Sequence, residues 1–143
     1  MKKADYRDAD LLIRLYDLRR EEVLRKARKW VASSQFECQS YEEFSAKYSP
    51  ESEENAYLGM TISYWDMVCA LVDRGLLNEE LFFSTTYEHM GVWQKVAAYV
   101  AGGRKAYDAP SWCASLEKVV LRHQAWFQSK KAPAKRRART KQK

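Results

Sequence analysis

Asp66 is the single residue whose setting most suggests chemistry. It lies between Trp65 and Met67 in the most apolar stretch of the chain. An unpaired carboxylate there would be costly, because burial strips it of water. If the stretch is a central helix, Asp66 needs a cationic partner, such as Arg14 or Arg25 of the first helix. Three interpretations stay open: the exposed edge of that helix, a buried ion pair that fixes the packing, and a cleft residue that contacts a ligand.

The two histidines, His89 and His123, are the next candidates. Each lies on or near an apolar stripe, which favours a partly buried, hydrogen-bonded histidine over a general base. Di-iron helical bundles use Glu-x-x-His pairs, but Thr86 and Val120 occupy the positions three residues earlier. Two histidines and three scattered cysteines also give no zinc-ligand spacing. The sequence therefore predicts no metal, no cofactor and no catalytic residue.

The pair Gly102-Gly103, followed by Arg104-Lys105, has the composition of an anion loop. Flexible backbone amides next to two cations can hold phosphate. The favoured interpretation is instead a helix C-terminus, where cations stabilise the negative end of the helix dipole. Whether the two glycines end that helix or only distort it stays open. Neither a nucleophile elbow nor a phosphate loop of known pattern occurs elsewhere in the sequence.

The last fourteen residues, 130–143, carry eight cations and no acid. The whole chain has 25 Lys/Arg and 19 Asp/Glu, so its net charge of +6 is a tail of +8 on a body of −2. The tail has no aromatic residue to stack on bases, so any polyanion binding is electrostatic and independent of sequence. A solvated tail without function is the alternative. The candidate polyanion-binding residues are Lys130, Lys131, Lys135, Arg136, Arg137, Arg139, Lys141 and Lys143.

Apolar residues recur at helical spacing along most of the chain, and only five glycines and three prolines interrupt it. The predicted helical segment 49–75 is apolar on more than one face, so it is predicted to be central. Poor helix formers between residues 85 and 91 predict a kink or a break in the helical segment 78–101. The sequence predicts an all-α fold, an antiparallel bundle of four main helices plus one short helix. The segments are 9–31, 40–47 (the short one), 49–75, 78–101 and 108–128.

Local signals mark several helix boundaries. Ser40 opens a capping-box pattern, and Ser49-Pro50 reads as a second helix start. Gly75, directly after a cation, is a stop signal. Asn78 caps the next segment, and Asp108 begins the last start signal, 108–111.

Four runs and one tryptophan carry a resemblance to known proteins. They are 15–20 (Leu-Tyr-Asp-Leu-Arg-Arg), 25–28 (Arg-Lys-Ala-Arg), 64–77 (opening with Tyr64-Trp65-Asp66), 78–80 (Asn-Glu-Glu) and Trp93. Together they resemble a group of small bacterial all-helical proteins that share a domain of unknown function. The resemblance covers residues 8–128 and leaves out the tail. Because its motifs are packing and capping signals, the resemblance implies the helical fold and assigns no catalytic residue to this chain.

The chain is predicted to hold one helical domain, residues 1–129, and a basic tail without structure, residues 130–143. Its odd number of widely spaced cysteines, Cys38, Cys69 and Cys113, fits free thiols in a reducing compartment. No secretory signal is visible, and no apolar stretch approaches the roughly 20 residues that span a bilayer. The sequence predicts a soluble cytoplasmic protein without a transmembrane segment.

These observations favour a non-enzymatic helical interaction module, an assembly or regulatory partner of an unidentified protein. Residues 1–31 carry +4 and residues 32–129 carry −6. This split indicates either solvated faces that pair within the molecule or a bipolar surface for a partner or for self-association. The alternative is an accessory nucleic-acid-associated protein that binds the phosphate backbone non-specifically through the tail and the first helix. A third hypothesis is an enzyme or small-ligand binder with a cleft near Asp66 and His89. Nothing in the sequence predicts the oligomeric state.

Overall fold

The computed structural model describes the backbone of residues 2–37 and 39–140, and their side chains as far as Lys131. All regular elements in this part of the chain are α-helices, which confirms the all-α prediction. Seven helices take the place of the predicted four main helices and one short helix. They are α1 (Tyr6–Arg19), α2 (Glu22–Ala32), α3 (Tyr41–Lys47), α4 (Glu53–Asp73), α5 (Glu79–Thr85), α6 (Glu88–Ala106) and α7 (Ala114–Thr140).

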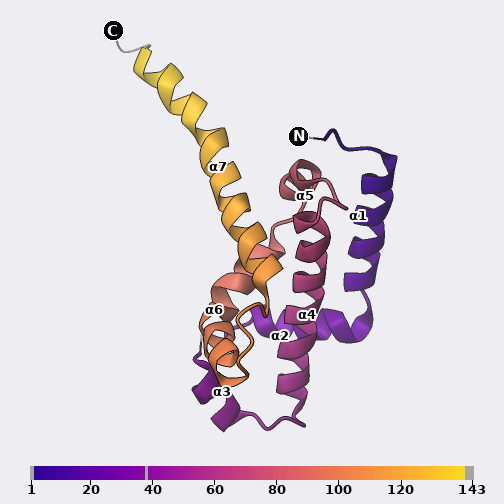
Figure 1. Ribbon diagram of the computed structural model, residues 1–143, viewed down its shortest axis with the longest axis vertical. Helices are drawn as coiled ribbons and strands as arrows, with labels where there is room; N and C mark the ends of the chain where they lie inside the picture. Colours follow the sequence, from indigo (N-terminus) through magenta and orange to yellow (C-terminus); the bar gives the residue numbers. More distant parts are fainter. Residues whose placement is uncertain (1, 38, 141–143) are drawn as a thin grey trace.

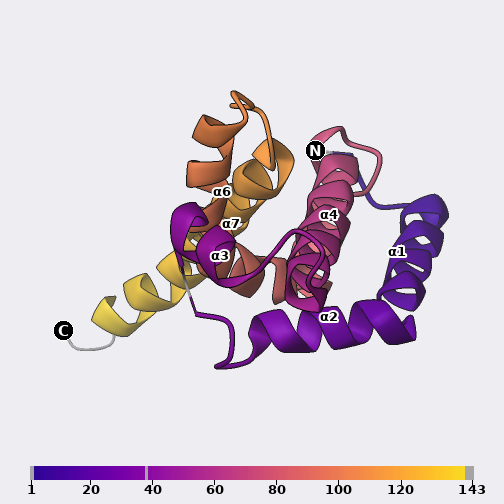
Figure 2. The same cartoon turned by 90° about the horizontal axis from the view of Figure 1, so that it is seen from below.

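Helix α4 lies at the centre of the molecule, as its apolar sequence predicts. Helices α2 and α7 pack against it, and α6 packs against α3 and α7 (Figure 1). Helix α2 crosses α4 steeply instead of running alongside it. Two parts stand apart from this body: α1 lies at one margin, and the C-terminal part of α7 extends away from it (Figure 2).

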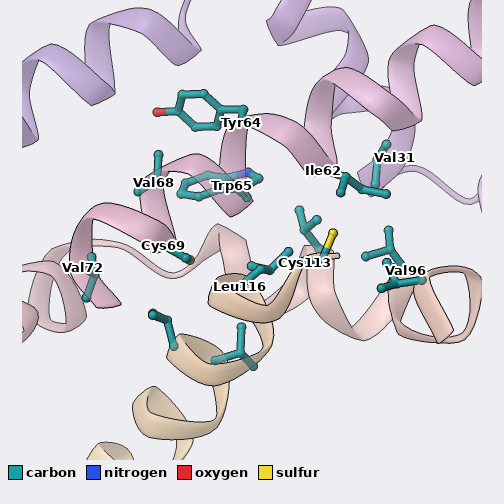
Figure 3. Packing of buried hydrophobic residues seen from close by; sticks show 14 of the residues in the cluster. Val31, Ile62, Tyr64, Trp65, Val68, Cys69, Val72, Val96, Cys113 and Leu116 are labelled. Atoms are coloured by element: carbon teal, nitrogen blue, oxygen red, sulfur yellow. The ribbon is translucent and has the colours of Figure 1, made fainter. Parts of the chain in front are cut away.

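The core is built around the α4 side chains. Trp65 and Cys69 are completely buried and face Leu116 of α7, while Ile62 faces Val31 of α2 (Figure 3). Burial of large apolar side chains on more than one face of a helix gains roughly 1.5–3 kcal/mol for each residue. This burial explains why α4 holds its place between several neighbours.

The prediction of a single helix over residues 9–31 is wrong, because the chain turns after α1. Arg20 closes α1, and the Glu21 carboxylate then accepts hydrogen bonds from the backbone amides of Val23 (3.0 Å) and Leu24 (2.8 Å). These bonds satisfy amides that would otherwise lack partners at the start of α2. Glutamate is not among the preferred N-cap residues, so the sequence contains no recognisable signal for this helix break.

Where a local side chain sets a helix boundary, the prediction is confirmed. The Ser40 hydroxyl accepts from an amide of α3 at 3.2 Å, and the Asn78 carbonyl accepts from an amide of α5 at 2.9 Å. Gly75 has a φ of +71°, the left-handed conformation of a helix stop. The predicted start at Ser49 is wrong by one turn, because Ser52 caps α4 instead.

The predicted fourth segment, residues 78–101, is two helices. Thr86 has extended backbone and ends α5, and α6 begins two residues later, so the predicted kink or break is a break. The β-branched side chains of Thr85 and Thr86 favour extended backbone over helix. Helix α6 then continues past Gly102 and Gly103 to Ala106, so the two glycines do not end it.

Gly102 and Gly103 allow two other segments to pack directly on α6. A Cβ atom on Gly102 would lie 2.5 Å from the Cβ of Tyr41, and one on Gly103 would lie 2.5 Å from Cζ3 of Trp112. Neither contact is compatible with a larger side chain. The two glycines are therefore sites of close approach for α3 and for the turn before α7.

The last helix differs from its prediction at both ends. It starts at Ala114 and not near Asp108, because Asp108 and Cys113 have φ values of +48° and +59°, which interrupt a right-handed helix. Its backbone is helical to Thr140, beyond the predicted helix end near residue 128. Alanine, lysine and arginine are strong helix formers, and Pro133 removes one backbone donor without ending the helix. Residues 141–143 lie outside the described part.

Candidate functional site

Asp66 joins α4 to the start of α7. Its Oδ1 accepts a hydrogen bond of 3.0 Å from the backbone amide of Leu116, in the first turn of that helix. The predicted partnership with Arg14 or Arg25 is wrong, and Arg14 instead pairs with Asp10 at 3.1 Å. A helix N-terminus offers free amides and a partial positive charge, so it can replace an arginine as the partner of a carboxylate. Asp66 of α4 therefore acts as a cap for the N-terminus of α7.

His89 and His123 are brought together although they are 34 residues apart in sequence. Their rings are completely buried and nearly parallel, with 3.1 Å between His89 Nε2 and His123 Nδ1. The hydrogen bonding agrees with the prediction, but the burial is complete and not partial. In a neutral pair one of these two nitrogens donates and the other accepts. The histidines therefore satisfy one ring nitrogen each, while His89 Nδ1 and His123 Nε2 are buried without a hydrogen-bond partner.

The surroundings of this pair keep both rings uncharged. Burial lowers the pKa of His89 to about 3, and the charge of the neighbouring His123 acts in the same direction. Burial also lowers the pKa of His123, against the opposing effects of the Phe83 carbonyl and the Glu79 carboxylate. At pH 7 both imidazoles are neutral.

An aromatic shell seals the histidine pair. The ring of Phe83 stacks on His123 at 4.2 Å between centroids, and Phe127 stacks on it at 5.0 Å. Trp65 and Phe82 contact His89. A general base must reach the proton that it removes, and this shell separates the imidazoles from solvent. The spacing of Phe82-Phe83 and Trp126-Phe127 on two apolar stripes is the sequence signal that could have placed the pair.

The thiols of Cys69 and Cys113 are free and buried. Burial raises the pKa of both thiols, that of Cys113 to about 12, and the charge of Asp66 adds to the effect. The thiolate is the nucleophilic form of cysteine. Neither side chain is therefore activated for nucleophilic chemistry. Cys38 lies outside the described residues.

A groove of about 200 Å³ opens between α1 and the surface of α4 and α5. The sequence predicts no such feature, because it assigns the leucines of the first helix to a core-facing stripe. The apolar interior is formed by Leu12, Leu15, Trp65, Val68 and Phe82. Ile13 and Tyr16, exposed by 68% and 51%, form the outer rim, and Arg19 lies among the lining residues of the same groove.

Two polar contacts hold α1 in position beside this groove. The Asp8 carboxylate accepts a 2.8 Å hydrogen bond from the backbone amide of Asn78 at the start of α5. The Tyr64 hydroxyl of α4 donates to the carbonyl of Leu15. Only Asp8 and Leu15 are buried among the residues of α1. The helix is fixed at these points and leaves most of its surface uncovered.

Arg19 carries a charge that no neighbouring acid neutralises. Its guanidinium carbon lies 4.7 Å from the centroid of the Tyr16 ring and 5.6 Å from that of Trp65. Its charge also acts on the Tyr64 hydroxyl, whose pKa it lowers against the larger opposing effect of burial. Among the described residues no carboxylate lies within ion-pair distance of it, whereas Arg28 pairs with Glu88 at 2.9 Å.

The remaining candidates have structural partners or fall outside the described side chains. Arg104 pairs with Glu117 at 2.8 Å and donates to the Trp112 carbonyl, so the stretch after the two glycines does not offer Arg104 as a free cation for an anion loop. Lys130 and Lys131 are exposed on α7, and Lys130 lies 3.8 Å from Glu80. The side chains of Lys135, Arg136, Arg137 and Arg139, and the whole of Lys141 and Lys143, lie outside the described residues.

Metal-binding clusters and membrane-spanning helices are both absent from the described residues. No group of three or more His, Cys, Asp or Glu side chains there is arranged to hold a metal ion. None of the helices in that part of the chain is long and apolar enough to cross a membrane.

Comparison with known proteins gives a family and no activity. No curated protein and no solved structure matches the chain. The model of one family, described as a domain of unknown function, matches residues 5–123, which include α1 to α6 and the first part of α7. This agrees with the resemblance over residues 8–128, and the chain belongs to the DUF4760 family.

Proposed function

We propose that this protein is a non-enzymatic interaction module that binds a segment of a partner protein in the groove beside α1. The observation that carries the proposal is the exposed apolar side of α1. Tyr6, Ile13 and Tyr16 are spaced seven and three residues apart, so they lie along one stripe of the helix. Ile13 and Tyr16 of this stripe also line the groove between α1 and the surface of α4 and α5. A contiguous apolar surface of this kind marks interaction sites on soluble proteins.

The shape of the groove suits a helix or an extended segment with apolar side chains. Recognition of an amphipathic segment needs a preformed apolar channel with a polar rim. Leu12 and Leu15 form one wall, and Trp65, Val68 and Phe82 lie opposite on α4 and α5. The two polar contacts that hold α1 keep these walls apart, so the channel exists before a partner arrives.

The titratable side chains of the core support an interaction role over a catalytic one. Asp66 caps α7, and the two histidines bond to each other inside an aromatic shell. One ring nitrogen of each histidine is thus engaged by the other histidine, and the rings do not face solvent. We also propose a cytoplasmic location, which the unpaired buried thiols of Cys69 and Cys113 support.

Site-specific photocrosslinking tests the docking proposal. A benzophenone side chain replaces Ile13 on the rim of the groove, and in a matched variant it replaces Leu121, which is 57% exposed on α7. We expect covalent adducts with a defined partner protein in cells of the source organism from position 13 only. Excess unlabelled protein should suppress these adducts, and the Ile13→Asp variant should not. Identical adducts from both positions, or none from position 13, would contradict the proposal.

The projecting part of α7 favours a second candidate function, non-specific binding of a polyanion. The backbone of α7 is helical well beyond the body of the protein, and Lys130 and Lys131 are exposed where it leaves. The segment 130–143 carries eight cations. A helical arm holds such charges away from the acidic middle of the chain, which would otherwise compete with phosphate for them.

Binding of duplex DNA across a salt series tests this second function. We expect the full chain to bind with a slope of log affinity against log salt of about −4 to −5, since about six phosphates would be neutralised. A chain that ends at Ser129 should lose this binding. Equal binding by the two chains, or no binding at low salt, would exclude the arm as a polyanion site.

A further inference from the structure

Arg19 lies at the groove with its charge available. Arg28 and Arg14 are neutralised, because Arg28 pairs with Glu88 and Arg14 pairs with Asp10. Arg20 also lies over the Tyr16 ring, but it is exposed and does not line the groove. The Arg19 side chain is half-buried, so water screens its charge less than that of an exposed arginine. The groove therefore combines apolar walls with one unneutralised cation.

The contacts of Arg19 leave it able to bind an anion. Its aromatic neighbours, Tyr16 and Trp65, interact with the positive charge and do not neutralise it. The nearby Tyr64 hydroxyl donates its hydrogen to the Leu15 carbonyl. A guanidinium has five N–H donors in a planar fork, and this geometry matches a carboxylate. The Tyr16 and Trp65 contacts also limit the orientations of the side chain, so less entropy is lost on binding.

The size of the groove limits what lies next to that carboxylate. A cavity of about 150 Å³ accepts a benzene molecule, so a groove of about 200 Å³ accepts one aromatic or two leucine-sized side chains. A carboxylate without apolar neighbours would leave these walls in water. An apolar group without a carboxylate would leave Arg19 unpaired in a less hydrated site.

We infer that the segment bound in the groove presents apolar side chains next to an Asp or Glu carboxylate, and that Arg19 binds this carboxylate. The inference rests on the proposed docking function and names the chemistry of the partner. Apolar contact supplies most of the affinity, while the pairing with Arg19 selects an acidic segment and fixes its direction along α1.

Two tripeptides that differ only in charge test the inference. They are acetyl-Leu-Leu-Glu-amide and acetyl-Leu-Leu-Gln-amide, titrated into the isotopically labelled full chain and followed by amide chemical shifts. We expect both to shift resonances of α1 and α4 around the groove, with the Glu peptide binding about fivefold tighter at low salt. In Arg19→Met the two affinities should become equal, at the level of the Gln peptide. Arg19→Lys should restore part of the preference, because it keeps the charge but loses the fork.

The matched control is Arg14→Met, which removes an exposed arginine of the same helix outside the groove. It should keep the full preference for the Glu peptide. Equal binding of the two peptides to the wild-type chain, or a preference that survives Arg19→Met, would overturn the inference and leave the docking function standing. No shift around the groove with either peptide, together with no crosslinks from position 13, would overturn both. Circular dichroism of each variant confirms that it is folded.

Discussion

His89 and His123 show how single residues in this core have been matched to their surroundings. They are the only histidines of the chain. Each would be charged in an unfolded chain below about pH 6.5. In the folded protein they form one shared hydrogen bond inside an aromatic shell that excludes water. Protonation of either ring would place a charge next to its partner in a buried site, and for His123 the favourable effect of Glu79 is smaller than the cost of burial.

This burial predicts a loss of stability in mild acid. The pKa of both histidines is lowered on folding, so the unfolded chain binds more protons below pH 6.5, and the free energy of unfolding falls as the pH decreases. For His89 the fall continues toward pH 3, by at most about 1.4 kcal/mol per pH unit. Urea denaturation between pH 4.5 and 7.5 measures it. In the folded protein the imidazole C–H resonances of His89 should not titrate between pH 5.5 and 7.5, and an ordinary titration of His89 near pH 6.5 would contradict the assignment.

Asp66 supplies a second test at the residue scale. Asp66→Ala removes the cap of α7 and should cost about 1 kcal/mol, the usual value for a lost N-cap. Asp66→Asn keeps an oxygen acceptor for the Leu116 amide and should cost only a few tenths of that. The exposed Asp17→Ala is the control and should be neutral. Chemical denaturation compares the four proteins. Equal costs for the Ala and Asn variants would show that charge, and not hydrogen bonding, holds the two helices together.

At the scale of elements, helix boundaries divide into those set locally and those set at a distance. Ser40, Asn78 and Gly75 act on their own helices, and the sequence predicts their roles correctly. The start of α7 depends on Asp66, fifty positions earlier in the chain. The break after α1 depends on Glu21, a residue type that rarely caps a helix. Patterns of neighbouring residues contain no signal for either boundary.

The glycines of α6 give opposite expectations for the same substitution. Gly91 has nothing within 4 Å of an added Cβ, so Gly91→Ala should stabilise the protein by about 0.5–1 kcal/mol through helix propensity. Gly103→Ala gains the same propensity but places a methyl group 2.5 Å from the ring of Trp112. Overpacking of this kind costs about 1–3 kcal/mol, so the net effect should be destabilising.

Thermal unfolding of the two variants beside the wild type decides this comparison. The melting temperature should rise for Gly91→Ala and fall for Gly103→Ala. If both variants were stabilised, Trp112 would have room to move aside, and the close approach of the turn before α7 would not depend on glycine.

At the scale of the whole molecule, the sequence predicts the fold class and the central helix but not the groove. The apolar period of α4 is strong enough to show that it is buried on more than one side. Leu12 and Leu15 follow the same kind of period, and from the sequence they read as ordinary core residues. Their position beside a groove depends on how α1 is held by Asn78 and Tyr64, contacts between residues far apart in the chain. The pairing of the histidines escapes local patterns for the same reason.

The continuity of α7 has a consequence for the residues on the C-terminal side of the family domain. The family match ends at residue 123, inside this helix, and the backbone remains helical to Thr140. Those residues therefore continue the helical shaft that begins in the domain. Each residue inserted into such a shaft turns everything beyond it by about 100° and advances it by about 1.5 Å. A change in the length of this helix therefore changes its phase as well as its reach.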